Sequence, residues 1–148
     1  MTTKGNAPQL ADFLCFAVYS ANLAFGKAYK PILDKLGLTY TQYIAIIALW
    51  EEDDQTVSGL GEKLFLESNT LTPILKKLEG KGYVQRRRDS ADERQVIVGL
   101  TAEGLALRER LSTDSVGTAC GLTQEEFADT REAVVRLRDN VARSLQKS

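Results

Sequence analysis

The sequence predicts a mainly α-helical domain with a small β wing, and three observations support this fold class. Apolar residues recur at helical spacing over most of the chain, two short β-type runs follow Gly80 and Gly82, and a polar turn separates those runs. The length of 148 residues fits one domain, and a hydrophobic content of 43% is enough for an ordinary packed core. We therefore treat residues 1–148 as a single domain.

The N-terminal third of the chain predicts two helices. From Gln9 onward apolar residues keep helical spacing, with Pro31 perturbing the pattern and the Leu36-Gly37-Leu38 sequence closing the element. A second helix is expected to begin at a cap supplied by Thr39 or Thr41. Because its sequence is apolar nearly all round, this second helix should be buried.

Two further short helices joined by a turn are predicted in the middle of the chain. Thr56 is positioned to cap the first, and Ser68-Asn69-Thr70 offers side-chain oxygens to cap the second. The second helix has an apolar face at i, i+3, i+4 and i+7 spacing, formed by Leu71, Ile74, Leu75 and Leu78. Its other face carries donors suited to phosphates and base edges, namely Thr70, Thr72, Lys76, Lys77 and Lys81. The pattern is that of a helix-turn-helix.

A basic two-stranded wing is predicted after these helices, with β runs at 83–88 and 95–100 and a polar turn at 89–94. From Ser68 to Arg94 seven basic residues face four acidic ones, a local net charge of +3 in a chain of net charge −1. Such asymmetry suits a protein that presents one face to DNA, although a basic run with no motif around it is more often solvated surface. The candidate DNA contacts are Ser68, Thr70, Thr72, Lys76 and Lys77 in the helix, and Arg86, Arg87, Arg88 and Arg94 in the wing.

The composition excludes several classes of function. The absence of histidine removes Ser/His/Asp and Cys/His catalysis and imidazole metal sites. Cys15 and Cys120 cannot build a four-thiolate zinc site and lie too far apart for a CxxC motif, so we expect no enzyme, metal or cofactor. No apolar run approaches the roughly 20 residues of a membrane helix, and no signal-peptide segment follows the first residues. The expected location is the cytoplasm, without membrane association.

Two helices are predicted in the C-terminal third, one from Thr101 to about Leu111 and one over 123–145, with Glu126 three residues after a Thr123 cap. We expect the helices at about 9–36 and 102–146 to dimerise, because neither terminal helix has enough neighbours if 39–101 forms a separate winged lobe. A symmetric dimer would place two recognition helices in major grooves about 34 Å apart, which predicts a pseudo-palindromic site on double-stranded DNA.

This order of elements includes Asp92-Glu93-Arg94 at the wing, followed by Val-Ile-Val-Gly-Leu-Thr-Ala-Glu-Gly. It resembles the MarR family of winged-helix transcription regulators, and the resemblance covers almost the entire chain. Several separate motifs resemble the organic hydroperoxide resistance regulators (OhrR) of that family. They are Leu14-Cys15-Phe16, Tyr19-Ser20, Tyr29-Lys30-Pro31, Leu38-Thr39-Tyr40, Gln42-Tyr43, Leu49-Trp50 and Leu71-Thr72-Pro73.

The resemblance implies a homodimeric repressor that binds an operator when reduced and releases it when an organic hydroperoxide oxidises its N-terminal cysteine. Cys15 matches the peroxidatic cysteine, and Cys120 lies where two-cysteine members keep a resolving cysteine. The tyrosines whose hydroxyls approach the sulfur, some from the partner chain, correspond to Tyr19, Tyr29 and Tyr40. At the wing tip the Asp92 carboxylate is implied to orient the guanidinium of Arg94, which enters the minor groove.

A sensor cysteine must react as a thiolate, and hydrogen bonds from tyrosine hydroxyls favour that anion. The neighbouring apolar side chains would favour apolar peroxides over hydrogen peroxide. Once Cys15 is a sulfenic acid, a nearby thiol condenses with it to a disulfide, and we hypothesise an intersubunit bond to Cys120. The competing interpretation is that Cys15 is an inert core cysteine and that Tyr29 and Tyr40 are ordinary packed aromatics.

Two other functions remain open at the level of sequence. A thiol peroxidase would turn over peroxide through Cys15 and Cys120 with no role for DNA, and steady-state consumption of peroxide would reveal it. A ligand-responsive MarR-type regulator would bind a small molecule between its lobes, and a thermal-shift screen of the Cys15→Ser protein would reveal that.

Overall fold

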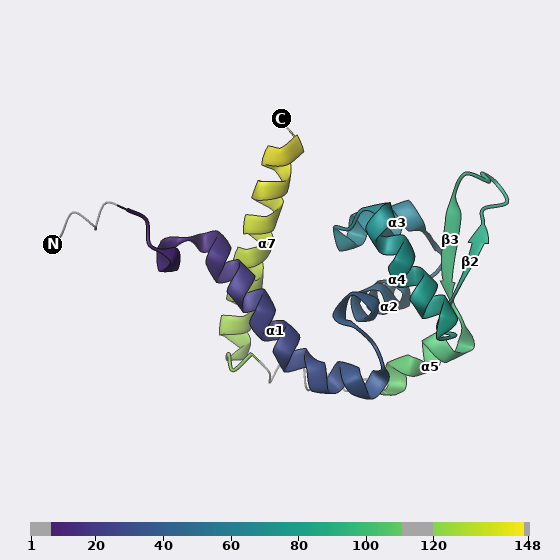
Figure 1. Cartoon of the computed structure of the whole chain (residues 1–148), viewed down its shortest axis with the longest axis horizontal. Coiled ribbons are helices and arrows are strands. Elements are labelled where there is room, and N and C mark those ends of the chain that lie inside the picture. The colour runs from purple at the N-terminus through teal and green to yellow at the C-terminus, as the bar shows by residue number, and fades with distance from the viewer. Residues whose placement is uncertain (1–6, 111–119, 147–148) are drawn as a thin grey trace. The chain divides into compact units, whose positions relative to one another are not determined.

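The structure is a computed structural model that describes residues 7–110 and 120–146. The chain forms two compact units, residues 1–111 and residues 112–148. Within the first unit, Figure 1 shows α2, α3 and α4 gathered beside the strands β2 and β3. The mainly helical fold with a small sheet confirms the predicted fold class.

The long N-terminal helix begins later than the sequence predicts. A short 3-10 segment, η2 (Leu10–Asp12), is separated from α1 (Leu14–Leu36) by Phe13, whose φ of −84° and ψ of 120° are extended. The expected continuous helix from Gln9 is therefore wrong, and Cys15 lies in the first turn of α1. The helix continues through Pro31 and closes at Gly37, whose left-handed φ of 69° is the geometry predicted for this cap.

The second helix, α2 (Tyr40–Glu51), is the centre of the core. Thr39 caps it: the Thr39 hydroxyl accepts from the Gln42 backbone at 3.3 Å, and the Gln42 side chain accepts from the Thr39 backbone at 3.0 Å. Ala45, Ile46 and Leu49 are completely buried, which confirms the expectation from their apolar sequence.

The two predicted short helices are α3 (Val57–Leu64) and α4 (Ser68–Gly80). Thr56 caps α3 as expected, with its hydroxyl accepting from the Gly59 backbone at 3.0 Å. The predicted side-chain cap of α4 is wrong, because Glu67 is the cap residue and makes no side-chain cap bond, while Ser68 is already helical. The predicted core face is confirmed at its three leucines: Leu71, Leu75 and Leu78.

The wing consists of β2 (Val84–Arg88) and β3 (Val96–Leu100), paired antiparallel from Val84 opposite Leu100 to Arg88 opposite Val96. A third strand, β1 (Gln55–Thr56), joins the outer side of β3, so the sheet order is β1-β3-β2. The sequence did not predict β1, because two residues just before a helix cap carry no alternating pattern.

The C-terminal helices are α5 (Ala102–Arg110) in the first unit and α7 (Gln124–Gln146) in the second. The indole nitrogen of Trp50 donates to the Gly104 carbonyl at 2.9 Å, which ties α5 to α2. The predicted box at Thr123 and Glu126 caps α7 through two bonds of 3.1 Å. Leu111, where the first of these helices was predicted to end, and residues 112–119 lie outside the described residues. Within the described ranges, no helix is long and apolar enough to cross a membrane.

Candidate nucleic-acid interface and cysteine site

The outward face of α4 carries most of the polar side chains that the sequence assigned to DNA. Ser68, Thr70, Lys76 and Lys77 are exposed, whereas Thr72 is half-buried. The Thr72 hydroxyl donates to the Ser68 carbonyl at 2.8 Å, so outward it offers only acceptor lone pairs and its methyl group. These side chains lie on one face of a helix whose opposite face is anchored in the core, as base contact in a groove requires.

Lys81 follows the last residue of α4 and is exposed. Its ammonium group donates to the carbonyl of Gly37, the residue that ends α1. The side chain therefore joins the end of α4 to the end of α1, and a DNA contact from its remaining N–H donors stays a prediction. This contact spans 44 positions of the sequence, and no local pattern predicts it.

The wing tip holds an exposed guanidinium in a fixed orientation. Arg94 donates from Nε to Asp92 Oδ1 at 3.0 Å and from its terminal nitrogen to Oδ2 at 3.1 Å, while its backbone N–H donates to Oδ1. These hydrogen bonds lower the pKa of Asp92, and the carboxylate raises the pKa of Arg94. The Arg94 side chain is 91% exposed, so the pair presents its cation to solvent in the geometry that the resemblance implies.

The three consecutive arginines of β2 are each held by an acceptor of the same lobe. Arg86 pairs with Glu79 at 3.0 Å, Arg87 pairs with Asp54 at 3.1 Å, and a terminal nitrogen of Arg88 donates to a wing carbonyl at 3.0 Å. The hydrogen bonds from Arg86 lower the pKa of Glu79. The sequence predicted that all three would touch phosphates, but it could not predict these acceptors.

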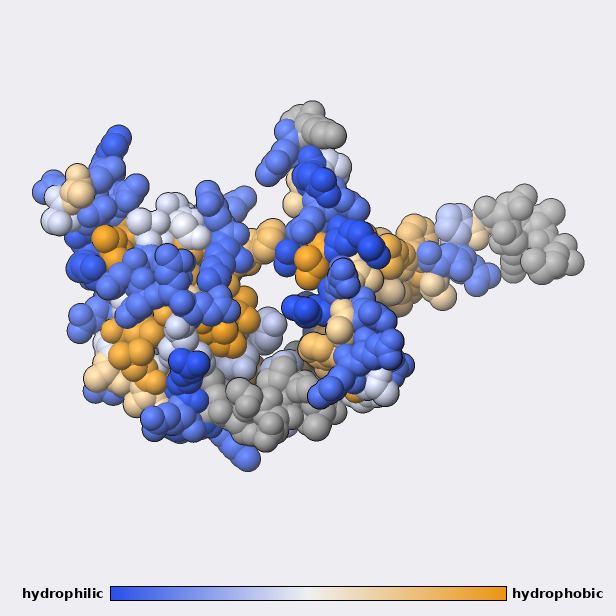
Figure 2. Space-filling view, turned by 180° about the vertical axis from the view of Figure 1, so that it is seen from behind, coloured by the Kyte–Doolittle hydropathy of each residue, from blue (hydrophilic) through white to orange (hydrophobic). Residues whose placement is uncertain are grey.

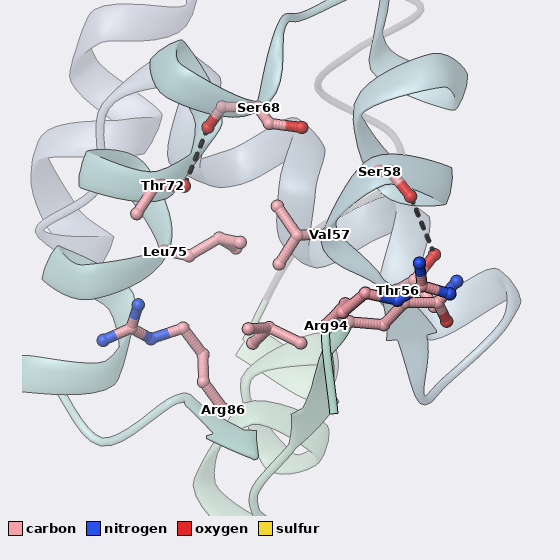
Figure 3. A pocket seen from close by; sticks show the side chains of 10 residues that line it. Thr56, Val57, Ser58, Ser68, Thr72, Leu75, Arg86 and Arg94 are labelled. Carbon is pink, nitrogen blue, oxygen red and sulfur yellow. Dashed lines mark hydrogen bonds between the residues drawn. The ribbon is translucent and has the colours of Figure 1, made fainter. Parts of the chain in front are cut away.

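A cavity of about 250 Å³ separates the helix-turn-helix from the wing. In Figure 3, Val57 and Leu75 point into it from α3 and α4, and Arg86 reaches from β2 toward α4. Its lining residues are Thr56, Val57, Ser58, Ser68, Thr72, Leu75, Arg86, Arg94, Gln95 and Val96. Two of these residues, Ser58 and Gln95, were not among the predicted site residues, although Ser58 lies two positions after the predicted Thr56 cap and Gln95 begins the second predicted β run.

Cys15 is a free, exposed thiol in the first turn of α1. Tyr19 lies one turn further along and is also exposed. Tyr29 lies 14 residues beyond Cys15 on the same helix, about 21 Å along its axis. One chain therefore brings Tyr19 near its own Cys15, but its Tyr29 lies far from that sulfur.

The other predicted tyrosines gather where α1 meets α2. The ring centroids of Tyr29 and Tyr40 are 5.7 Å apart, and Tyr43 lies 6.1 Å from Tyr29 and 6.3 Å from Tyr40. Burial raises the pKa of Tyr43, and Tyr40 adds to this effect. The sequence quoted Tyr43 only as part of a family motif, and its place in this cluster became visible only in the fold. Cys120, half-buried, lies in the second unit just before Gly121.

The cysteine end of the chain also carries uncovered apolar side chains. None of residues 10–25 is buried, and Leu14 is 62% exposed. Figure 2 shows hydrophobic surface along this segment, beside the grey N-terminal residues. The exposed apolar residues are Leu10, Phe13, Leu14, Val18, Tyr19, Leu23 and Phe25.

Comparison with known proteins identifies the family. A family described as transcriptional regulator SarA/Rot matches residues 27–111. The organic hydroperoxide resistance transcriptional regulator of Bacillus subtilis (strain 168) is 42% identical over 132 residues, which cover 89% of this chain and 89% of that protein. This chain belongs to the MarR family of winged-helix transcriptional regulators. The HTH-type transcriptional regulator TtmR of Methylorubrum extorquens (strain PA1) is also 42% identical over 142 residues, covering 95% of this chain and 73% of that protein.

Solved structures of a MarR-type regulator named AbfR agree with this assignment. Reduced AbfR bound to DNA superposes with a TM-score of 0.76 at 37% identity, covering 92% of this chain and 94% of that chain. AbfR in a disulfide form superposes with a TM-score of 0.64 at 36% identity, covering 93% and 92%. The chain is thus a transcriptional regulator of the type to which OhrR and AbfR belong. The predicted resemblance to the OhrR branch is confirmed.

Proposed function

We propose that the protein is a redox-sensing repressor that binds a pseudo-palindromic operator as a reduced homodimer and releases it when an organic hydroperoxide oxidises Cys15. The observation that carries this proposal is the division of the sensor residues along α1. Cys15 is an exposed thiol at one end, and Tyr29 lies about 21 Å away beside Tyr40. A second copy packed along α1 would bring its own Tyr29 and Tyr40 to this sulfur.

The dimer is proposed to form through the helices at about 9–36 and 102–146, around a winged lobe at about 39–101. Exposed apolar side chains support this, because covering them removes hydrophobic surface from water. The N-terminal segment is uncovered, and α7 has no buried residue among those described, with Val141 and Leu145 51% and 70% exposed. Symmetric dimers are the commonest way to cover such surfaces.

In the proposed complex with DNA, α4 lies in the major groove. Ser68, Thr70 and Thr72 contact bases or phosphates, and Lys76 and Lys77 contact phosphates. The exposed Arg94, oriented by Asp92, enters the adjacent minor groove. The structure of reduced AbfR on DNA supports an operator complex of this type.

The proposed switch begins when the Cys15 thiolate attacks the terminal peroxide oxygen. The O–O bond breaks, the alkoxide takes a proton and leaves as an alcohol, and Cys15 becomes a sulfenic acid. The thiolate of Cys120 in the partner subunit then attacks that sulfur, forming an S–S bond while hydroxide leaves and is protonated to water. The solved disulfide form of the related regulator AbfR supports a disulfide step in this chain. A disulfide needs Cα atoms within about 7 Å, and the resulting displacement would change the spacing of the recognition helices.

The test is operator release. A duplex selected from random sequences by the reduced protein is titrated before and after one equivalent of cumene hydroperoxide. We expect the wild type to lose operator binding and Cys15→Ser to retain it. Equal release of Cys15→Ser would contradict the proposal, as would continuous peroxide turnover with a thiol donor, which indicates a peroxidase.

The disulfide is tested separately on non-reducing gels. The oxidised wild type should migrate as a covalent dimer, and both Cys15→Ser and Cys120→Ser should migrate as monomers. A covalent dimer from Cys120→Ser would eliminate Cys120 as the resolving cysteine while leaving the sensing role of Cys15 intact.

A further inference from the structure

We infer that the arginine run of β2 is a brace that holds the wing against the recognition helix, and that Glu79 is the residue that positions the wing for operator binding. This inference rests on the proposed binding of DNA by the lobe and is independent of the redox step. It replaces the sequence-based expectation that Arg86, Arg87 and Arg88 act as phosphate contacts.

The first half of the brace joins α4 to β2. Glu79, in the last turns of the recognition helix, accepts the Arg86 backbone N–H at 3.1 Å, its Nε at 3.3 Å and a terminal nitrogen at 3.0 Å. The Arg86 side chain is only 25% exposed. The Glu79 carboxylate thus binds the Arg86 guanidinium group through two nitrogens and also binds the backbone of the same residue. Three bonds of this kind fix both the distance and the angle between helix and strand.

The second half of the brace holds the opposite face of the wing. Successive side chains of a strand point to opposite faces, so Arg87 is directed away from Arg86 and meets Asp54 at 3.1 Å. The neighbouring Asp53 accepts the Leu100 backbone N–H at 2.9 Å. Asp54 also approaches Gly99 so closely that a β-carbon on Gly99 would clash with its carboxylate. The loop after α2 therefore packs closely against the C-terminal end of β3.

The third arginine closes the wing itself, since Arg88 donates to the Glu93 carbonyl across the turn at 3.0 Å. All three guanidinium groups thus have acceptors within the lobe. Arg94 at the wing tip is 91% exposed, against 56% for Arg87 and 25% for Arg86. The arginines of β2 thus serve mainly the geometry of the wing, and Arg94 is the more exposed cation.

The brace predicts an effect opposite to that of simple electrostatics. Glu79 is an anion on the lobe that meets a polyanion, so charge alone predicts that Glu79→Gln binds DNA more tightly. If Glu79 positions the wing, Glu79→Gln weakens operator binding instead, because recognition helix and wing must contact adjacent grooves together. The two explanations therefore differ in the sign of one measurement.

The experiment compares Glu79→Gln with the matched control Glu62→Gln. Glu62 lies on α3, in the same lobe, and is exposed to solvent. Dissociation constants are measured on the selected operator and on a random duplex. We expect Glu79→Gln to bind the operator about tenfold more weakly, with random-duplex binding unchanged or tighter, and Glu62→Gln to change neither. Equal or tighter operator binding by Glu79→Gln would overturn the inference.

Two further experiments test whether Glu79 and Arg86 position the wing. A charge swap distinguishes positioning from a loss of stability, and a salt titration distinguishes it from a phosphate contact by Arg86. The double variant Glu79→Arg with Arg86→Glu should bind the operator more tightly than Glu79→Arg alone. Its melting temperature should be like that of the wild type.

The salt titration uses Arg86→Gln. This variant should weaken operator binding without changing the salt slope of that binding, whereas a lost phosphate contact lowers the slope by about one. A lower slope would return Arg86 to the phosphate contacts. Failure of the reduced wild type to select any operator would instead refute the proposed function.

Discussion

The winged lobe and the terminal helices differ in how much of their apolar surface is buried within one chain. In the lobe, Leu49, Leu60 and Leu75 are completely buried within one chain. In the N-terminal segment 10–25 and in α7, no described residue is buried. The lobe, together with the end of α1 and with α5, therefore has a core within one chain. Residues 10–25 and α7 instead present apolar surface that we propose a second copy covers. Cys15, the proposed sensor thiol, lies in the exposed N-terminal segment, and the candidate DNA contacts lie in the lobe with the buried core.

The strongest test of this contrast is a substitution that creates a cavity in the core of the lobe. Leu49→Ala removes a fully buried side chain of α2, and truncations of this kind cost about 2–5 kcal/mol. We expect the free energy of unfolding in urea to fall by this amount at every protein concentration. A loss that vanished at high concentration would show that the lobe also depends on the partner copy.

The counterpart in the terminal helices is Val141→Glu on α7. Val141 is 51% exposed in one chain, so the substitution should leave the lobe folded. Burying an unpaired carboxylate in an interface should weaken dimerisation by about a hundredfold. Analytical ultracentrifugation measures this change, with the exposed Glu125→Gln on the same helix as a control. An unchanged dimer would exclude this face of α7 from the interface.

A smaller effect is expected at the wing tip. Arg94→Ala removes the exposed cation and should weaken operator binding with a salt slope reduced by about one, without changing the melting temperature. Operator titrations between low and moderate salt provide the measurement. Unchanged binding at every salt concentration would remove Arg94 from the DNA interface.

The smallest expected effect is a pH dependence at the start of α7. The Thr123 backbone N–H donates to the Glu126 carboxylate, and this hydrogen bond lowers the pKa of Glu126 below its ordinary value of 4.5. A lowered pKa means that this cap is intact at neutral pH and is lost as the pH falls through the folded-state pKa. NMR titration of the Glu126 side chain should give a midpoint below 4.5 that returns toward 4.5 in Thr123→Ala. An ordinary midpoint in the wild type would contradict the cap.

The sequence predicted most of the lobe because its signals are local. The helical spacing of Leu71, Leu75 and Leu78 identified the recognition helix, and Thr39 and Thr56 marked helix starts. The start of α1 and the cap of α4 were wrong, because an extended Phe13 and a helical Ser68 leave no distinctive pattern.

The partners within the candidate site could not be predicted from the sequence. Arg87 and Asp54 are 33 positions apart, and only the antiparallel sheet brings them together. The same limit applies to Lys81 and the end of α1. The acceptors of the three β2 arginines could not be predicted because composition records charge and not the groups that the fold places beside it.

The central claim is that the sensor site is shared between two copies of the chain, and mixed dimers test it directly. In a dimer of one Cys15→Ser chain and one Tyr29→Phe chain, Cys15 is present only in the Tyr29→Phe chain. Tyr29 is present only in the partner chain. The measurement is the rate of Cys15 sulfenic acid formation with cumene hydroperoxide, per Cys15. A shared site predicts the wild-type rate in this mixed dimer and a slower rate in the Tyr29→Phe homodimer. A mixed dimer as slow as the Tyr29→Phe homodimer would contradict the account.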